Sequence, residues 1–198
     1  MKPMPIPTVC HGLWRSVAAL ARDRRGIAAT EFVVIVPIML VMFFGTVEFS
    51  SGIAVDRKVT LVARTLSDLT SQSTTVASTD TANFFAASTA ILTPYSATPT
   101  KAAISELYVN PSTLKATVQW NQTYQGATAR AVGSTVTIPS ALAVGGTYLI
   151  FSEVSYLYTP TVGYVMAKAG ITLSDVAYTR PRQSLCVFFS PATACTTN

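Results

Sequence analysis

Glu31 is the residue whose type and position point most clearly to chemistry, because this carboxylate stands at the start of a long apolar run. An acid within a membrane segment costs free energy and is a functional suspect by default. A free α-amino group is a suitable partner, because it is cationic near neutral pH. If the chain is cut after Gly26, Ile27 carries such an amine. We therefore expect Glu31 of one subunit to pair with the α-amino group of Ile27 of a neighbour. At a separation of about 4 Å, the attraction is about 1 kcal/mol in water and about 4 kcal/mol at an effective dielectric constant near 20.

Side chains for catalysis or metal binding do not form a recognisable set. The single histidine, His11, lies in the N-terminal segment, which leaves the rest of the chain without a Ser-His-Asp or Cys-His arrangement. No Cys/His spacing matches a zinc site, and no glycine-rich stretch has the ending of a phosphate-binding loop. We expect no enzymatic activity, no metal and no cofactor. The acids of the body are scattered, and we interpret them as solvated surface charges: Asp68, Asp80, Glu106, Glu153 and Asp175.

The three cysteines lie near the two ends of the chain. Cys186 and Cys195 lie close together near the C-terminus, whereas Cys10 lies in the N-terminal segment. Two thiols at this spacing in an oxidising compartment are expected to form a disulfide, which the chain-entropy model values at roughly 2.5–3 kcal/mol. The alternative is a pair of free thiols in a flexible tail.

The positive charge is concentrated at the N-terminus. Residues 1–26 carry five of the fourteen Lys and Arg residues and one of the nine acids, so the rest of the chain is close to neutral. A nucleic-acid-binding protein needs basic residues clustered on its folded body. The charge distribution therefore argues against nucleic acid as a partner.

Residues 27–49 form a largely apolar segment of 23 residues. As a helix it is about 35 Å long, enough to cross a hydrocarbon core of roughly 30 Å. Arg22, Arg24 and Arg25 directly precede it and predict a cytoplasmic N-terminus, with the body of the protein outside the cytoplasm. The alternative, a buried core helix, is disfavoured by the length of the segment and its basic flank.

The helical pattern continues beyond the apolar segment. Apolar residues recur at spacings of four and three along one helix face, namely Val55, Val59, Val62, Leu66 and Leu69. One helix from about residue 27 to about residue 71 is predicted, membrane-buried in its first part and amphipathic over residues 50–72. We expect the stripe to pack on the protein's own body, with a neighbouring subunit's helix as the alternative.

Residues 73–198 are expected to form an extracytoplasmic α+β domain. Residues 70–81 are rich in Ser and Thr and predict a linker. Residues 81–92 predict a short helix, capped by Asp80 or Thr81, that turns Phe84, Phe85, Ile91 and Leu92 inward. Strands are predicted at residues 102–109, 114–121, 147–159 and 170–181, with a minor one in "TVTIP". In residues 114–121 the buried face is predicted to carry Leu114, Ala116, Val118 and Trp120, and the exposed face Lys115, Thr117, Gln119 and Asn121. An antiparallel sheet packed on the amphipathic helix follows.

The N-terminal motif resembles the signal of prepilins and pseudopilins and, more closely, the TadE/TadG-like family of the tight-adherence (Flp) pilus system. The family opening "G…A…EFA…P…FG…EF" is matched by Gly26, Ala29, Glu31, Phe32, Pro37, Phe44, Gly45, Glu48 and Phe49. The stretch "AYTRPR" also looks like the usual close of the family. Thr30 departs from the Val or Ala that is common there. The N-terminal resemblance covers about 50 residues.

The resemblance implies a fold, a processing step and a set of partners. Prepilin peptidase would cleave between Gly26 and Ile27, because its site accepts little bulk before the cut, and the leader arginines would hold residues 1–26 at the membrane. Glu31 and Phe32 would then serve assembly. The mature chain would be a minor pilin-like subunit, or pseudopilin, spanning the bacterial inner membrane once. Its partners would be other pilin or pseudopilin subunits, the inner-membrane assembly platform and membrane lipid.

Two other readings of the N-terminal segment remain. An ordinary signal peptide would be cleaved after the small residues Gly52 to Ala54, which would release a protein that begins at Val55. The apolar run exceeds the usual 7–15 residues of such signals, and Glu31 would then have no purpose. An uncleaved single-pass anchor that scaffolds an envelope complex is the other alternative.

Overall fold

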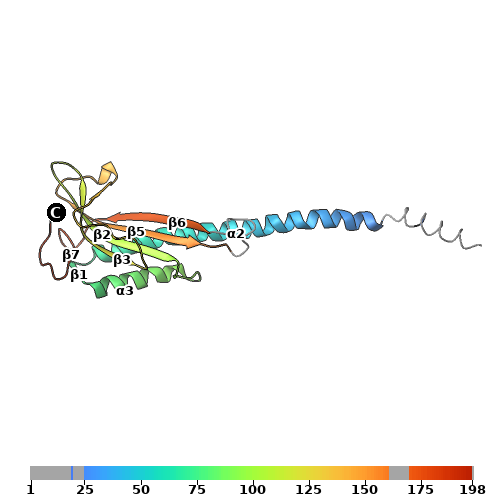
Figure 1. Cartoon of the computed structure of the whole chain (residues 1–198), viewed down its shortest axis with the longest axis horizontal. Coiled ribbons are helices and arrows are strands. Elements are labelled where there is room, and N and C mark those ends of the chain that lie inside the picture. Colours follow the sequence, from blue (N-terminus) through green and yellow to red (C-terminus); the bar gives the residue numbers. More distant parts are fainter. Residues whose placement is uncertain (1–18, 20–24, 161–169, 198) are drawn as a thin grey trace, which may run out of the picture. The chain divides into compact units, whose positions relative to one another are not determined.

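The computed structural model describes residue 19 and residues 25–160 and 170–197. The chain divides into two compact units, Met1–Thr46 and Val47–Asn198. Most of the expected leader, including Arg22 and Arg24, lies outside the described residues. The elements follow the chain in the order α2 (Arg25–Ser71), β1 (Thr75–Val76), α3 (Ser78–Thr89), η1 (Ala90–Leu92), β2 (Thr100–Val109), β3 (Ala116–Tyr124), β4 (Thr135–Val136), η2 (Ser140–Leu142), β5 (Tyr148–Tyr158), β6 (Ile171–Thr179) and β7 (Phe188–Phe189) (Figure 1).

The long helix predicted from the apolar run and the stripe is confirmed. Helix α2 begins at Arg25 and ends at Ser71, and it includes Pro37. Val55, Val59, Val62 and Leu66 of the stripe are fully buried. Burying one such side chain stabilises the fold by roughly 1.5–3 kcal/mol. These residues share a core with strand residues of the same chain, so the stripe packs on the protein's own sheet.

Five strands form one antiparallel sheet in the order β4-β3-β2-β5-β6. Strand β2 lies at its centre, paired with β3 on one side and β5 on the other. One face packs on α2 and α3 through Ile104, Trp120, Ile150 and Val154, and the opposite face carries a smaller apolar cluster around Leu107, Val118, Leu149 and Phe151. The predicted α+β class, a long helix with an antiparallel sheet, is therefore confirmed (Figure 1).

Contacts along α2 fix its direction relative to the sheet. The Tyr158 hydroxyl meets Glu48, the Ser152 hydroxyl donates to the Ala63 carbonyl oxygen, and Ser67 meets Thr179. As the helix advances from Glu48 to Ala63, the contacted position on β5 moves from Tyr158 to Ser152, toward the N-terminus of the strand. The second half of α2 therefore runs antiparallel to β5 and parallel to β6.

The linker and the short helix differ from the prediction. Helix α3 begins at Ser78 rather than at residue 81, after Ala77 as the N-cap, and Phe85 and Leu92 are buried while Phe84 and Ile91 are half-buried. Asp80 stands in the first turn, where its carboxylate accepts the Ala77 N–H at 2.8 Å. A carboxylate at this position satisfies an unpaired amide and suits the positive end of the helix. The linker itself contributes β1, which pairs in parallel with β7 near the C-terminus.

The predicted alternation of residues 114–121 is wrong at two positions. Leu114 is 51% exposed and has φ 55°, because the turn after Asn110 extends to Lys115 and the strand begins only at Ala116. Gln119 was expected on the exposed face but is buried. Its amide donates to both oxygens of Thr117, which allows a polar side chain to be buried there.

Candidate functional site

The segment from Gly26 to Phe32 lies in the first turns of α2. The site at Gly26 is open, since a Cβ atom added there meets nothing within 4 Å. Glu31 lies four residues beyond Ile27, which is about 6 Å along a helix axis. The Glu31 side chain is exposed and takes part in neither of the ion pairs found among the described residues. Gly26 and Glu31 are therefore both accessible to another molecule in this unit.

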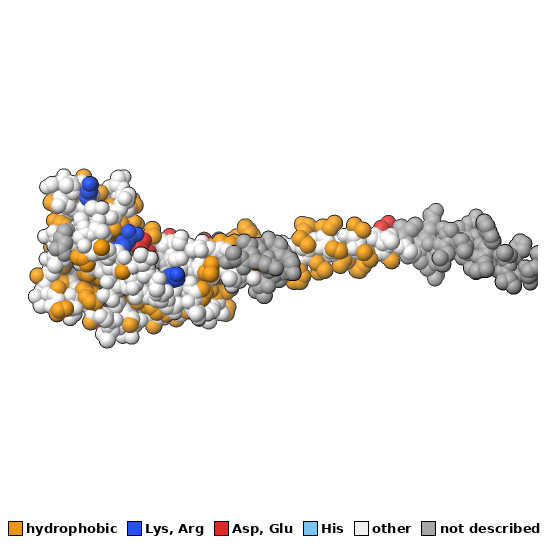
Figure 2. All heavy atoms as spheres, viewed as in Figure 1, with side chains coloured by type: hydrophobic (Ala, Val, Ile, Leu, Met, Phe, Trp, Pro, Cys, Tyr) orange, Lys and Arg blue, Asp and Glu red, His pale blue; other side chains and the backbone are white. Residues whose placement is uncertain are grey.

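The surface beyond Glu31 is apolar. Phe32, Val33, Met39 and Met42 are each at least 63% exposed, and Figure 2 shows hydrophobic side chains covering this part of α2. One helix among the described residues is long and apolar enough to cross a membrane, within Ala29–Ser71, and only 6% of its most apolar window is buried. Exposed apolar side chains in such a row are unfavourable in water and favourable in lipid. This part of α2 has the length and surface of a single membrane span.

Glu48 is a buried acid at the start of the second unit. Its side chain is 5% exposed, and the Tyr158 hydroxyl donates to its Oε2 atom at 3.2 Å. Burial and the hydrogen bond to Glu48 raise the pKa of Tyr158. The sequence places Glu48 in the motif of the N-terminal segment and does not predict this contact. A carboxylate beside an apolar segment was the available signal, but its tyrosine partner lies 110 residues further along the chain.

Glu106 corrects the prediction that the acids beyond the apolar run are solvated. It lies in the central strand β2 and is 1% exposed. The Val187 N–H donates to Glu106 Oε1 at 2.6 Å, and the Trp120 indole N–H donates to the Val187 carbonyl oxygen at 2.6 Å. Burial raises the pKa of Glu106 from 4.5 to about 8, although hydrogen bonds from Val187 and Trp120 act in the opposite direction. This carboxyl group is therefore largely protonated at neutral pH.

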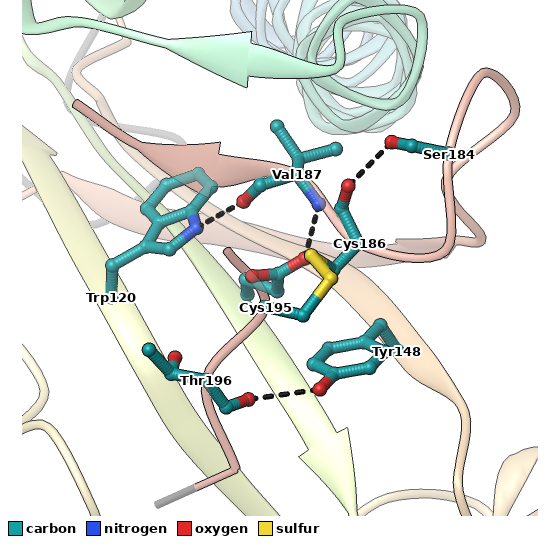
Figure 3. The surroundings of a disulfide bond; sticks show 8 residues. Trp120, Tyr148, Ser184, Cys186, Val187, Cys195 and Thr196 are labelled. Atoms are coloured by element: carbon teal, nitrogen blue, oxygen red, sulfur yellow. Dashed lines mark hydrogen bonds between the residues drawn. A yellow bond between two sulfur atoms is a disulfide. The ribbon is translucent and has the colours of Figure 1, made fainter. Parts of the chain in front are cut away.

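Cys186 and Cys195 form a disulfide next to Val187 (Figure 3). Their Cα atoms are 5.8 Å apart, within the ordinary range for disulfides. Cys186 is fully buried, whereas the residues between Ser190 and Cys195 are exposed. The disulfide thus closes a short exposed loop whose first residue is anchored in the core.

Lys58 ties α2 to the end of the short helix. Its Nζ atom donates to the carbonyl oxygens of Ile91 and Thr93, both at 2.8 Å. A cation at the end of a helical segment satisfies carbonyl groups that have no partner within it. The described residues contain no group of three or more His, Cys, Asp or Glu side chains placed to hold a metal ion.

Comparison with known proteins agrees with the N-terminal motif. Residues 26–67 match the family model described as TadE-like protein. The match begins at Gly26, includes Glu31 and Glu48, and ends within the buried stripe of α2. No curated protein and no solved structure matches the chain. Residues 26–67 are therefore similar to the TadE-like family.

Proposed function

We propose that the protein is a minor pilin-like (pseudopilin) subunit required for assembling a tight-adherence (Flp) type IV pilus. The observation that carries this proposal is the TadE-like segment, because it contains an accessible glycine, an accessible acid and a membrane-length apolar surface on one helix. The body packed on the second half of α2 is an extracytoplasmic domain. It provides the surface that distinguishes this subunit from a bare membrane helix.

The first step of the proposal is cleavage between Gly26 and Ile27 by prepilin peptidase. Its support is the open surroundings of Gly26 and the basic residues before it. N-terminal sequencing of the protein from cells with active peptidase should give Ile27. Replacing Gly26 with Phe should block cleavage because of the added bulk at the cut. Gly52→Ala is the control and should leave cleavage intact, because Gly52 lies far along the helix from the cut and its new Cβ fits, with its nearest neighbour at 3.7 Å. Recovery of intact Met1 from the unmodified chain would refute processing.

The second step is pairing of Glu31 with the new α-amino group of a neighbouring subunit. Its support is the exposure of Glu31 and its distance of one helical turn from Ile27. The attraction of about 4 kcal/mol at an effective dielectric constant near 20 is large for a single contact between subunits. Glu31→Ala and Glu31→Gln should leave cleavage largely intact and impair pilus assembly. Glu31→Asp keeps the charge and should restore part of it, and normal piliation in Glu31→Gln would exclude the pairing.

The proposed setting is the bacterial inner membrane, with the N-terminus in the cytoplasm. The leader arginines favour this orientation by the positive-inside rule. The partners would be other pilin or pseudopilin subunits and the assembly platform, with no nucleic acid involved. The orientation can be tested in spheroplasts with cysteines introduced on the body. These cysteines should react with a reagent added outside the inner membrane, and reaction only from the cytoplasmic side would contradict the proposed orientation.

An uncleaved anchor that scaffolds an envelope complex is the alternative, and it shares the membrane span but keeps Met1. A secreted form that begins at Val55 is less compatible with the fold. Such a cut would remove Glu48 from Tyr158 and separate residues 47–54 from the helix that holds the sheet. N-terminal sequencing separates all three possibilities.

A further inference from the structure

An exposed apolar surface continues from helix α2 onto the end of the sheet where β5 ends and β6 begins. In α2, Phe49 is 62% exposed and Ile53 is 41% exposed. In β5, Leu157 is 43% exposed, although it lies far from both in the sequence. Ile171 and Leu173 at the start of β6 are half-buried. These five side chains are here called the basal patch.

The basal patch contains a shallow pocket of about 190 Å³. Its walls are formed on one side by helix α2 and on the other by the two strands, namely by Phe49, Gly52 and Ile53 and by Tyr158, Ile171 and Leu173. Gly52 leaves room here, because it has no side chain to fill the space beside the Tyr158 ring. The pocket is therefore an apolar hollow that opens to the outside of the body.

The charges of α2 avoid the basal patch. Glu48 is the one charged residue of α2 between Glu31 and Asp56. Its side chain is 5% exposed and accepts the hydrogen bond of the Tyr158 hydroxyl, so its carboxylate is withdrawn from the surface. Asp56, at the rim of the pocket, and Arg57 are exposed, and they begin less than one turn beyond Ile53. The apolar surface of α2 thus ends at this level.

The length of the apolar segment places the basal patch at the edge of a bilayer. As a helix, residues 27–49 are about 35 Å long, whereas a hydrocarbon core is roughly 30 Å thick and a bilayer with its polar layers roughly 40–45 Å. Each polar layer is therefore about 5–7 Å thick. Ile53 lies four residues beyond Phe49, which is about 6 Å along a helix axis. If the segment spans a membrane, Phe49 to Ile53 lie where the acyl chains meet the headgroups.

The strand residues of the basal patch lie at the same level as this part of α2. Tyr158 holds the end of β5 on the helix through its hydrogen bond to Glu48, and its ring lies beside Gly52. Ile171 pairs with Tyr158 across the sheet, and Leu157 precedes it in β5. The end of the sheet is therefore fixed next to the part of the helix that leaves the hydrocarbon core.

We propose that the basal patch is seated in the membrane, at the boundary between acyl chains and headgroups of the extracytoplasmic leaflet. The folded body then contacts lipid through its strands as well as through α2. This inference rests on the membrane span of the proposed function. Lipid is the occupant because the patch continues, without an exposed charge on α2, the apolar surface that the span itself exposes through Val47 and Phe49. A row of exposed apolar side chains is unfavourable in water, and tyrosine is favoured at this depth of a bilayer.

Seating the patch in lipid has a consequence for the orientation of the body. Contact through both α2 and the strands restricts rotation of the body about the helix. The turn between β2 and β3, which contains Leu114, lies at the opposite end of the sheet, because the other end of β2 pairs with Tyr156. This turn would then be held away from the membrane.

The test measures how deep single positions lie in a bilayer. The full chain with Cys10→Ser is placed in phospholipid nanodiscs, and a nitrobenzoxadiazole fluorophore is attached to a cysteine introduced by Ile53→Cys or Leu157→Cys. Cys186 and Cys195 are joined in the disulfide and do not react. Fluorescence quenching is recorded with lipids that carry a nitroxide either near the headgroup end or near the methyl end of the acyl chain.

Two further positions calibrate the measurement. Met39→Cys reports the span itself, because Met39 lies near the middle of the apolar segment and is 63% exposed. Leu114→Cys is the matched control, since Leu114 is 51% exposed but lies at the far end of the sheet. Met39 should be quenched more by the nitroxide near the methyl end, and Leu114 by neither.

The fluorophores at Ile53 and Leu157 should both be quenched, and more by the nitroxide near the headgroup end. Quenching at Met39 without quenching at Leu157 would overturn this inference and leave the span intact. Emission from Leu157 that is blue-shifted but not quenched would overturn it too, because protein rather than lipid would then cover the patch. Absence of quenching at Met39 would overturn the span, and the inference with it.

A charge placed in the basal patch should withdraw the strands from lipid. With the fluorophore at Leu157, Ile53→Asp should reduce quenching by the nitroxide near the headgroup end. Val144→Asp is the control, because Val144 is 46% exposed and lies in the loop that contacts Val109 at the far end of the sheet, and it should leave quenching unchanged. Far-ultraviolet circular dichroism checks that both variants are folded, and Ile53→Ser replaces Ile53→Asp if the latter is not. Quenching that is unchanged in a folded Ile53 variant would show that the patch does not hold Leu157 at the membrane.

Discussion

Glu106→Gln should make the stability of the oxidised body nearly independent of pH in the range where the unmodified protein loses stability. The group has its ordinary pKa of 4.5 in the unfolded chain and a pKa of about 8 in the folded one. Because the folded pKa is the higher one, the folded state binds the extra proton between these values. Stability is therefore fully present below pH 4.5 and is lost as pH rises toward 8.

The size of the effect follows from the shift. Each unit of pKa difference corresponds to 1.36 kcal/mol, so the total loss between pH 4.5 and pH 8 is about 5 kcal/mol for an isolated group. Between pH 5 and pH 7 the free energy of unfolding should fall by about 2–3 kcal/mol. Such a loss is a large fraction of the 5–15 kcal/mol typical of a folded domain. Gln has nearly the same shape as Glu and can still accept from Val187, so it removes the titration and leaves the packing largely in place.

The assay is urea unfolding of the full chain in micelles, followed by far-ultraviolet circular dichroism at several pH values. The difference in unfolding free energy between Glu106→Gln and the unmodified protein should be small near pH 5 and grow to about 2–3 kcal/mol at pH 7 in favour of Gln. Glu153→Gln should keep the pH slope of the unmodified protein. If Glu106→Gln retained that slope too, the loss of stability would originate in other groups and the reasoning from burial would be wrong.

Three further substitutions test other parts of the body. Replacing Cys186 and Cys195 together with Ser should lower the free energy of unfolding by roughly 2.5–3 kcal/mol, and unchanged urea midpoints with and without reductant would contradict this. Lys58→Met should cost about 2–3 kcal/mol because two carbonyl oxygens lose a charged donor, whereas Arg57→Met, on an exposed neighbour, should cost under about 0.5 kcal/mol in the same denaturation assay. Gly145→Ala should destabilise by about 1–3 kcal/mol because its Cβ would lie 2.6 Å from a backbone atom of Pro111, and an unshifted thermal midpoint would argue against this close approach.

Much of the helix and sheet pattern could be predicted because it depends on local periodicity. The stripe from Val55 to Leu66 required only the helical repeat, and the aromatic and β-branched run of β5 required only strand preference. The boundaries of α3 and β3 were less predictable. The carboxylate of Asp80 accepts the N–H of Ala77 three residues before it, and the turn after Asn110 places Leu114 in a left-handed conformation, so turn and cap geometry moved both boundaries.

The buried acids could not be predicted from their neighbours in the chain. Glu106 looks like any acid in an alternating strand until Val187, 81 positions later, lies over it. Glu48 has its tyrosine partner on β5, and the linker strand β1 has its pairing partner beyond the last long strand. In each case the contact joins segments separated by more than 80 residues.

The sequence by itself determined the membrane-length helix, the basic segment before it, the position of Glu31 and the α+β character of the body. These features arise from residues close together in the chain, whose spacing is enough to predict them. Only the tertiary structure decided which acids are exposed and which are buried. The charge state of a carboxyl group depends on the water and the donors around it. For Glu106, the segment around Val187 supplies a donor and covers the carboxyl group from the far end of the chain.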